Sequence, residues 1–120
     1  MASVTELMIL KLFEARQQTH VLHLNTNSYA KHIALGEFYD GILDLIDEFV
    51  EVYQGSYGKM TLTGSMSISE PDPILYLDSV LTTILVYRES LDVKDTHLQN
   101  IVDEIVSLIN RTLYKLRYLN

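Results

Sequence analysis

The chain of 120 residues has no cysteine, only two prolines and only five glycines. The absence of cysteine excludes a disulfide framework and every thiolate metal site. No stretch approaches the roughly eighteen apolar residues that a membrane-spanning helix needs. Glu6 and Lys11 interrupt the apolar N-terminal part, so it lacks the hydrophobic region of a signal peptide. We therefore expect one domain, residues 1–120, that is cytoplasmic and has no membrane partner.

Basic residues are also scarce. Nine Lys and Arg stand against sixteen Asp and Glu, which gives a net charge of -7 and an isoelectric point near 4.9. Phosphate binding depends on clustered Lys and Arg. Only Arg111, Lys115 and Arg117 lie close together, and basic residues in a last helical turn are equally explained by the helix dipole. We expect no nucleic acid partner.

What the chain does contain is helical periodicity in four segments. The first runs from a capping box of Ser3 and Glu6 to about Leu24. The second begins at the N-cap candidates of residues 25–28 and runs to about Gln54. Its apolar residues keep helical spacing over five turns or more. This pattern is typical of helices that bury one face against their neighbours.

Two further helices follow a long irregular segment. Asp72 caps and Pro73 opens the third, which runs to about Ser90. Residues 91–94 form a short turn, and a capping box of Thr96 and Gln99 begins a fourth helix that reaches the C-terminal end. The short turn predicts that the third and fourth helices are antiparallel.

The irregular segment, residues 55–72, decides the topology. Eighteen extended residues span up to roughly 60 Å, whereas the second helix is about 40 Å long. The segment can therefore return along the whole bundle, which makes the second and third helices parallel. The sequence thus predicts an all-α, ferritin-like four-helix bundle with a long crossover loop between helices 2 and 3. The alternation of Met60, Leu62, Met66 and Ile68 leaves a small hairpin as an alternative.

Four possible metal ligands lie at fixed intervals: His20, His32 twelve residues later, Asp47 fifteen further and Glu51 four further. Asp47 and Glu51 are one helical turn apart and share a face. Imidazole and carboxylate together suit iron, zinc or manganese. Taken alone, His20 is more often a hydrogen-bonded core histidine, and the acids are more often a solvated helix face.

At these residues a family resemblance enters. The run HVLHLNTNSYAKHIALGEFYDGILDLIDEFVE resembles the ferroxidase segment of the Dps-type miniferritins, and the compact chain resembles small Dps-like proteins of tailed phages. The resemblance implies a homodimer or higher homo-oligomer in which His20 and His32 of one subunit meet Asp47 and Glu51 of another. It further implies iron binding and Fe(II) oxidation by peroxide or oxygen at that interface, in the host cytoplasm if the protein is phage-encoded.

Two departures from the family pattern favour a second hypothesis. Gly36 occupies the position of an Asp, and Val21 that of a Trp. A shifted register, with His23, Leu24 and Asn25 as the His-Trp-Asn of the family, makes His23 a lesser ligand candidate. The chain is therefore either a possible ferroxidase or a non-catalytic helical-bundle interaction protein that has lost the metal site, because fold alone does not decide function.

Overall fold

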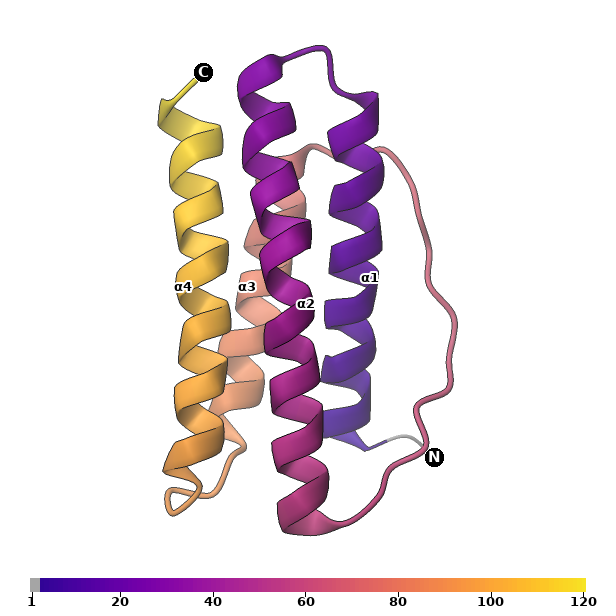
Figure 1. Cartoon of the computed structure of the whole chain (residues 1–120), viewed down its shortest axis with the longest axis vertical. Helices are drawn as coiled ribbons and strands as arrows, with labels where there is room; N and C mark the ends of the chain where they lie inside the picture. Colours follow the sequence, from indigo (N-terminus) through magenta and orange to yellow (C-terminus); the bar gives the residue numbers. More distant parts are fainter. Residues whose placement is uncertain (1–2) are drawn as a thin grey trace.

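The computed structural model of the chain describes residues 3–120 as four α-helices joined by two short turns and one long loop (Figure 1). The helices are α1 Val4–Asn25, α2 Tyr29–Tyr57, α3 Pro73–Glu89 and α4 Thr96–Tyr118. The predicted all-α fold is confirmed. The alternative hairpin is wrong, because residues 58–72 contain no strand. Among the described residues, no helix is both long and apolar enough to cross a membrane.

Three of the four helices begin at the predicted caps. Ser3 accepts a hydrogen bond from the backbone of Glu6 and Ser28 accepts one from Lys31. Asp72 accepts from two backbone amides at the start of α3. Each cap satisfies amides that have no partner inside the helix.

The predicted capping box of Thr96 and Gln99 is wrong. Asp95 occupies the N-cap position of α4 and makes no side-chain cap hydrogen bond. The Gln99 side chain instead donates to the carbonyl of Asp92, at 3.3 Å, in the preceding turn. This turn is ordered by Asp92, whose carboxylate accepts from the backbone of Lys94.

The second helix also continues beyond its predicted end at Gln54. It runs on through Gly55 to Tyr57 and stops at Gly58, whose φ of +101° is open to glycine and strained for other residues. The added turn places the ring of Tyr57 beside that of Tyr53, with centroids 4.9 Å apart. Tyr57 then reaches Asp95 at the start of α4. Tertiary contacts of this kind explain why glycine does not end the helix.

The helices form a closed ring in which α1 packs on α2, α2 on α4, α4 on α3, and α3 on α1. In Figure 1, α1 and α4 run upward while α2 and α3 run downward. Every packed pair is therefore antiparallel, and the parallel pairs lie on the diagonals. This is the crossover arrangement that the length of the loop predicted.

The crossover loop, residues 58–72, runs along the outside of α1 from one end of the bundle to the other (Figure 1). The buried side chain of Gln18 holds it by two hydrogen bonds of 2.9 Å, one to the carbonyl and one to the amide of Ser69. Tyr76 donates to Glu14 at 3.0 Å. Burial opposes ionisation of Glu14, but hydrogen bonds from Lys11, Tyr76 and the Ser67 backbone outweigh it and lower the Glu14 pKa.

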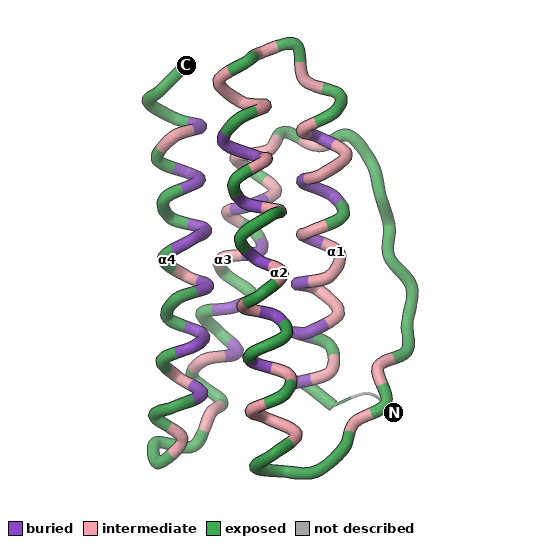
Figure 2. The backbone as a smooth tube through the Cα atoms, viewed as in Figure 1, coloured by how far each residue is buried: buried purple, intermediate pink, exposed green. Residues whose placement is uncertain are grey.

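The core lies along the axis of the ring, and Figure 2 shows the buried positions on the inward side of each helix. Each large apolar side chain buried here contributes about 1.5–3 kcal/mol through removal of its surface from water. The largest fully buried side chains come from all four helices and include Ile9, Leu12, Phe38, Phe49, Leu77, Ile84, Leu98, Ile105 and Ile109. This shared core fixes the helices that position the sites described next.

Candidate functional site

Three of the four histidines gather with one tyrosine at the end of the bundle where α1 leads into α2. The rings of His23 and His32 stack with centroids 3.7 Å apart, and the ring of His20 stacks on that of Tyr39 at 4.0 Å. His20 and His23 meet edge to face at 6.1 Å. All four side chains are half-buried. We call these four residues the histidine cluster.

Reciprocal hydrogen bonds close the cluster. The Nδ1 atom of His23 lies 2.6 Å from the carbonyl oxygen of His32, and Nδ1 of His32 lies 2.9 Å from the carbonyl oxygen of His23. Because a carbonyl only accepts, each Nδ1 carries a proton and donates. In the neutral rings, the lone pair is therefore on Nε2. His23 lies in the last turn of α1, so the His32 ring also satisfies a carbonyl that lacks a helical partner.

Gly36 makes room for this cluster. A Cβ atom built on Gly36 would lie 3.0 Å from Cε1 and 3.1 Å from Nδ1 of His23. Real Cβ atoms tolerate such contacts only if the neighbour moves, and the His23 ring is held by its stack and its hydrogen bond. The miniferritin pattern has an Asp at the position of Gly36. In this chain, the ring of His23 occupies the space that the side chain of such an Asp would need.

The four predicted metal ligands lie in two separate places within one chain. His20 and His32 belong to the histidine cluster, whereas Asp47 and Glu51 are exposed further along α2. Fifteen helical residues separate His32 from Asp47 by about 22 Å. In residues 3–120, no three His, Asp or Glu side chains are grouped so as to hold a metal ion. A site shared between two subunits, as the resemblance implies, stays a prediction.

The bundle interior offers no alternative metal centre among the described residues. Its buried polar side chains are Thr5, Gln18, Thr19 and Thr112. Thr19 and Thr112 donate to backbone carbonyls one turn earlier, and Thr5 pairs with Tyr87 at 2.9 Å. Di-iron sites inside ferritin-like bundles need inward carboxylates and histidines. The interior described here contains none.

A second feature is a groove of about 470 Å³ between α2 and α4. Gly41 lies on its floor, where the Leu108 side chain would be 3.5 Å from an added Cβ. The groove is lined by Gly41, Asp44, Leu45, Glu104, Leu108 and Arg111, among others. Its floor is thus apolar and its two helices each supply a carboxylate. We call it the acidic groove.

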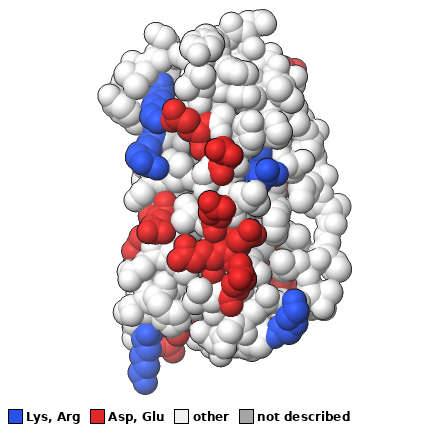
Figure 3. All heavy atoms as spheres, viewed as in Figure 1, with Lys and Arg blue, Asp and Glu red and all other residues white. Residues whose placement is uncertain are grey.

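Further carboxylates adjoin the acidic groove on the outward side of α2. They are the exposed side chains of Asp40, Asp47, Glu48 and Glu51. Figure 3 shows Asp and Glu gathered over the middle of the face that α2 and α4 form, with Lys and Arg nearer its margins. Within residues 3–120, neither these acids nor Asp44 and Glu104 form an ion pair with Lys or Arg. Arg111 also lines the groove, so the face presents a net negative charge.

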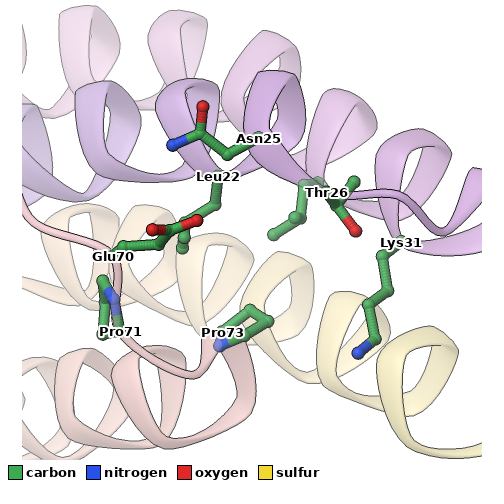
Figure 4. A pocket seen from close by; sticks show the side chains of 8 residues that line it. Leu22, Asn25, Thr26, Lys31, Glu70, Pro71 and Pro73 are labelled. Carbon is green, nitrogen blue, oxygen red and sulfur yellow. The ribbon is translucent and has the colours of Figure 1, made fainter.

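A smaller cavity of about 140 Å³ lies beside the α1–α2 turn. Figure 4 shows Asn25 and Thr26 from the end of α1, Lys31 from α2, and Glu70, Pro71 and Pro73 from the crossover loop and the start of α3 around it. Pockets that bind small organic ligands measure about 300–1,000 Å³. This cavity is below that range and suits a few water molecules.

The opposite end of the bundle is closed by tyrosines. Tyr57 donates a hydrogen bond to Asp95, which raises the pKa of Tyr57 to about 12. Burial raises the pKa of Tyr87. Both phenols are therefore protonated at neutral pH, so neither is suited to act as a general base there.

Comparison with known proteins identifies the family of this chain. Residues 23–116 match the model of a family of unknown function, DUF5856. The chain belongs to this family. It is also similar to an uncharacterised 14.6 kDa protein in the mobD-ri intergenic region of Enterobacteria phage T4, with 29% identity over 108 residues, 88% of this chain and 81% of the phage protein. No solved structure matches.

The DUF5856 match contains no reference to ferritins, so the resemblance to Dps-type proteins gains no support from it. The match spans His23, His32, Asp47 and Glu51 but begins after His20. The sequence alone did not show that His23 stacks on His32, because His32 lies on the next helix and only the tertiary structure brings the two rings together. The sequence analysis also missed Glu104, because only the tertiary structure shows that α4 packs against α2. The exposed acids at 103 and 104, beside the apolar stripe of the fourth helix, were the available signal.

Proposed function

We propose that this member of the DUF5856 family is a non-catalytic interaction protein whose acidic groove binds a basic segment of a partner protein. The main support for this proposal is that the groove combines an apolar floor with carboxylates on both bordering helices. An amphipathic helix that places apolar side chains in a groove and Lys or Arg along its edges fits such a surface. We place the interaction in the cytoplasm, that of the host if the gene is carried by a phage, as in the T4 relative.

Electrostatics support this proposal. Asp40 and Asp44, Asp44 and Glu48, and Asp47 and Glu51 are like-charged pairs four residues apart on α2, each destabilising by about 0.2–0.5 kcal/mol. A cationic partner removes this repulsion. The net charge of -7 also attracts a basic partner over a distance and speeds its association.

The acidic groove is complete within one chain, whereas the predicted iron site is not. Its floor and its acids come together in a single chain. The predicted iron site, in contrast, needs a second subunit to bring Asp47 and Glu51 to the histidines. In addition, His23 and His32 already use their rings to join α1 to α2.

The test is binding of a fluorescent helical peptide with leucine at every third or fourth position and lysine along the edges of that apolar face, followed by anisotropy. Asp44→Asn combined with Glu104→Gln should weaken binding about tenfold or more, because both charged walls are neutralised. The matched control is Glu70→Gln with Glu89→Gln, which removes the same charge from exposed sites outside the groove. Equal weakening by both pairs would mean general charge attraction and would reject the proposal.

A second candidate function is iron binding and Fe(II) oxidation at a dimer interface, with iron as the substrate. One observation favours it: within residues 3–120, Asp47 and Glu51 are exposed and form no ion pair, and Nε2 of His32 is not used in the bond to His23. One chain could therefore offer its carboxylates to the histidines of another.

The iron candidate is tested by anaerobic Fe(II) titration with elemental analysis and native mass. Glu51→Gln and His20→Ala should each reduce uptake more than His23→Ala, and the Asp44→Asn, Glu104→Gln pair should leave uptake unchanged. Equal uptake by the parent and by the Glu51 and His20 variants would reject this candidate while leaving the groove proposal intact.

A further inference from the structure

A second groove, of about 580 Å³, lies between α1 and α3. Because the ring order is α1, α2, α4, α3, it is on the side of the bundle opposite the acidic groove. Its lining includes Val4, Leu7, Lys11, Thr82, Thr83 and Val86. We call it the neutral groove.

The surface around the neutral groove contrasts with the remainder of this acidic protein. Among the described residues of the lining, Lys11 is the one that is charged, and Glu14 neutralises it in an ion pair of 3.0 Å. On α3, Leu75, Ser79, Thr82 and Val86 follow steps of four, three and four residues, so they form one outward row. Leu75 is 70% exposed and Val86 68% exposed. An uncharged row with exposed aliphatic side chains thus borders the groove.

We propose that a second copy of this chain docks on the neutral groove, forming a two-fold symmetric dimer. Charge identifies the occupant. Two copies of net charge -7 repel each other, and the repulsion is smallest where the contact surface lacks carboxylates. The outward side of α2 has five exposed acids between Asp40 and Glu51, which disfavours contact there. A basic partner, in contrast, gains no charge attraction from the neutral groove.

The shape of the surface also fits a second copy. In a two-fold interface, one patch must supply both the protruding side chains and the hollow that receives them. Val86 and Leu7 protrude at the edge of the groove, and both are more than half exposed. Ser79, Thr82 and Thr83 are small, which lets a second α3 approach closely. A stable interface buries roughly 800 Å² per partner, so the contact would include the outward row of α3 as well as the groove.

The first experiment is sedimentation velocity of the full chain at micromolar concentration, with Val86→Glu as the interface variant. Val86 is exposed, so the fold tolerates the change, and two copies of the new carboxylate would face each other in the dimer. We expect a dimer in the parent and an increase of about tenfold or more in the dissociation constant of the variant. The matched control is Val93→Glu in the α3–α4 turn, where Val93 is 81% exposed; it should remain dimeric.

The second experiment uses the absence of cysteine from the chain. Thr82→Cys introduces a single thiol on the outward row, and a short bis-maleimide should link two copies covalently in high yield, whereas Val93→Cys should link poorly. A monomeric parent overturns the proposal, and so does a dimer that survives Val86→Glu. Peptide binding in the acidic groove should be the same in Val86→Glu as in the parent, so failure of the dimer is distinguishable from failure of the proposed function.

Discussion

The acidic groove and the neutral groove are built alike but differ in their surfaces. Each lies between two antiparallel helices on opposite sides of one ring, and each exposes apolar side chains. The acidic groove has Asp44 from α2 and Glu104 from α4 in its lining, with more acids along α2. The neutral groove has Thr82, Thr83 and Val86, and Lys11 in its lining is paired with Glu14.

The packing of the helices thus determines where the two grooves lie, and the outward residues determine what each groove binds. The inward residues of all four helices are similar aliphatic and aromatic side chains. Only the outward positions separate a face suited to a basic partner from a face suited to a second copy. Substitutions of outward residues alone should therefore change what each groove binds without changing the fold.

The largest expected effect comes from reversing the charge of the acidic groove. Asp44→Lys with Glu104→Lys places two cations beside Arg111, so affinity for the basic peptide should fall about 100-fold. The dimer should be unaffected, because the changes lie on the opposite side of the ring. Anisotropy and sedimentation measure the two properties in one preparation. Loss of the dimer in this variant would show that the two grooves are not independent.

A smaller effect is expected at the histidine cluster, which joins a helix of the neutral face, α1, to a helix of the acidic face, α2. Gly36→Ala should be less stable than Gly55→Ala by about 1–3 kcal/mol, because its Cβ meets the His23 ring. Gly55 has no atom within 4 Å of an added Cβ, so alanine there gains helix propensity without a clash. Urea denaturation measures both. Equal stability would show that the His23 ring moves aside freely.

The third prediction concerns Glu14, which keeps the neutral groove neutral by pairing with Lys11. Glu14→Gln should lower the free energy of unfolding by about 1–2 kcal/mol at neutral pH. The pKa of Glu14 is lowered in the folded protein, so its stabilisation is present above the ordinary pKa of a glutamate and is lost as the pH falls through the folded pKa. Thermal unfolding of parent and variant should therefore converge in acid. A difference that stays constant down to acidic pH would contradict this account.

The smallest expected effect is none. At physiological salt we expect no retardation of duplex DNA by the parent, because the acidic face opposes phosphates and Lys11, which lines the neutral groove, is already paired with Glu14. A gel-shift titration measures this. The Asp44→Lys, Glu104→Lys variant is included because it removes two acids from the acidic face and adds two cations. Tight binding by the parent that weakens steeply with added salt would be the contrary result.

The sequence was sufficient for the fold because its strongest signals are local. Ser3, Ser28 and Asp72 cap helices where they were expected to do so, and the length of the crossover loop selected the ring topology. The failure at Thr96 arose because Asp92 orders the preceding turn and attracts Gln99. A capping pattern in the sequence indicates a local preference, and here hydrogen bonds to neighbouring residues outweigh it.

The candidate site was less predictable, since it depends on which helices become neighbours. The interval from His20 to Glu51 was visible, but the stacking of His23 on His32 and the space at Gly36 required the tertiary structure. The two grooves join residues about sixty to eighty positions apart, such as Asp44 with Glu104 and Leu7 with Val86. No periodicity within one helix records such pairings.

The crossover loop also divides the molecule into two hairpins, α1 with α2 and α3 with α4. Its hydrogen bonds lie at Met60 on one side of Gly64 and at Ser67 and Ser69 on the other, so cleavage at Gly64 would remove the covalent link and no helix–helix contact. Each groove takes one helix from each hairpin, and either hairpin alone would leave its apolar side in water. The protein is thus suited to fragment complementation: two separately expressed halves would create both binding surfaces only at the moment they reassemble.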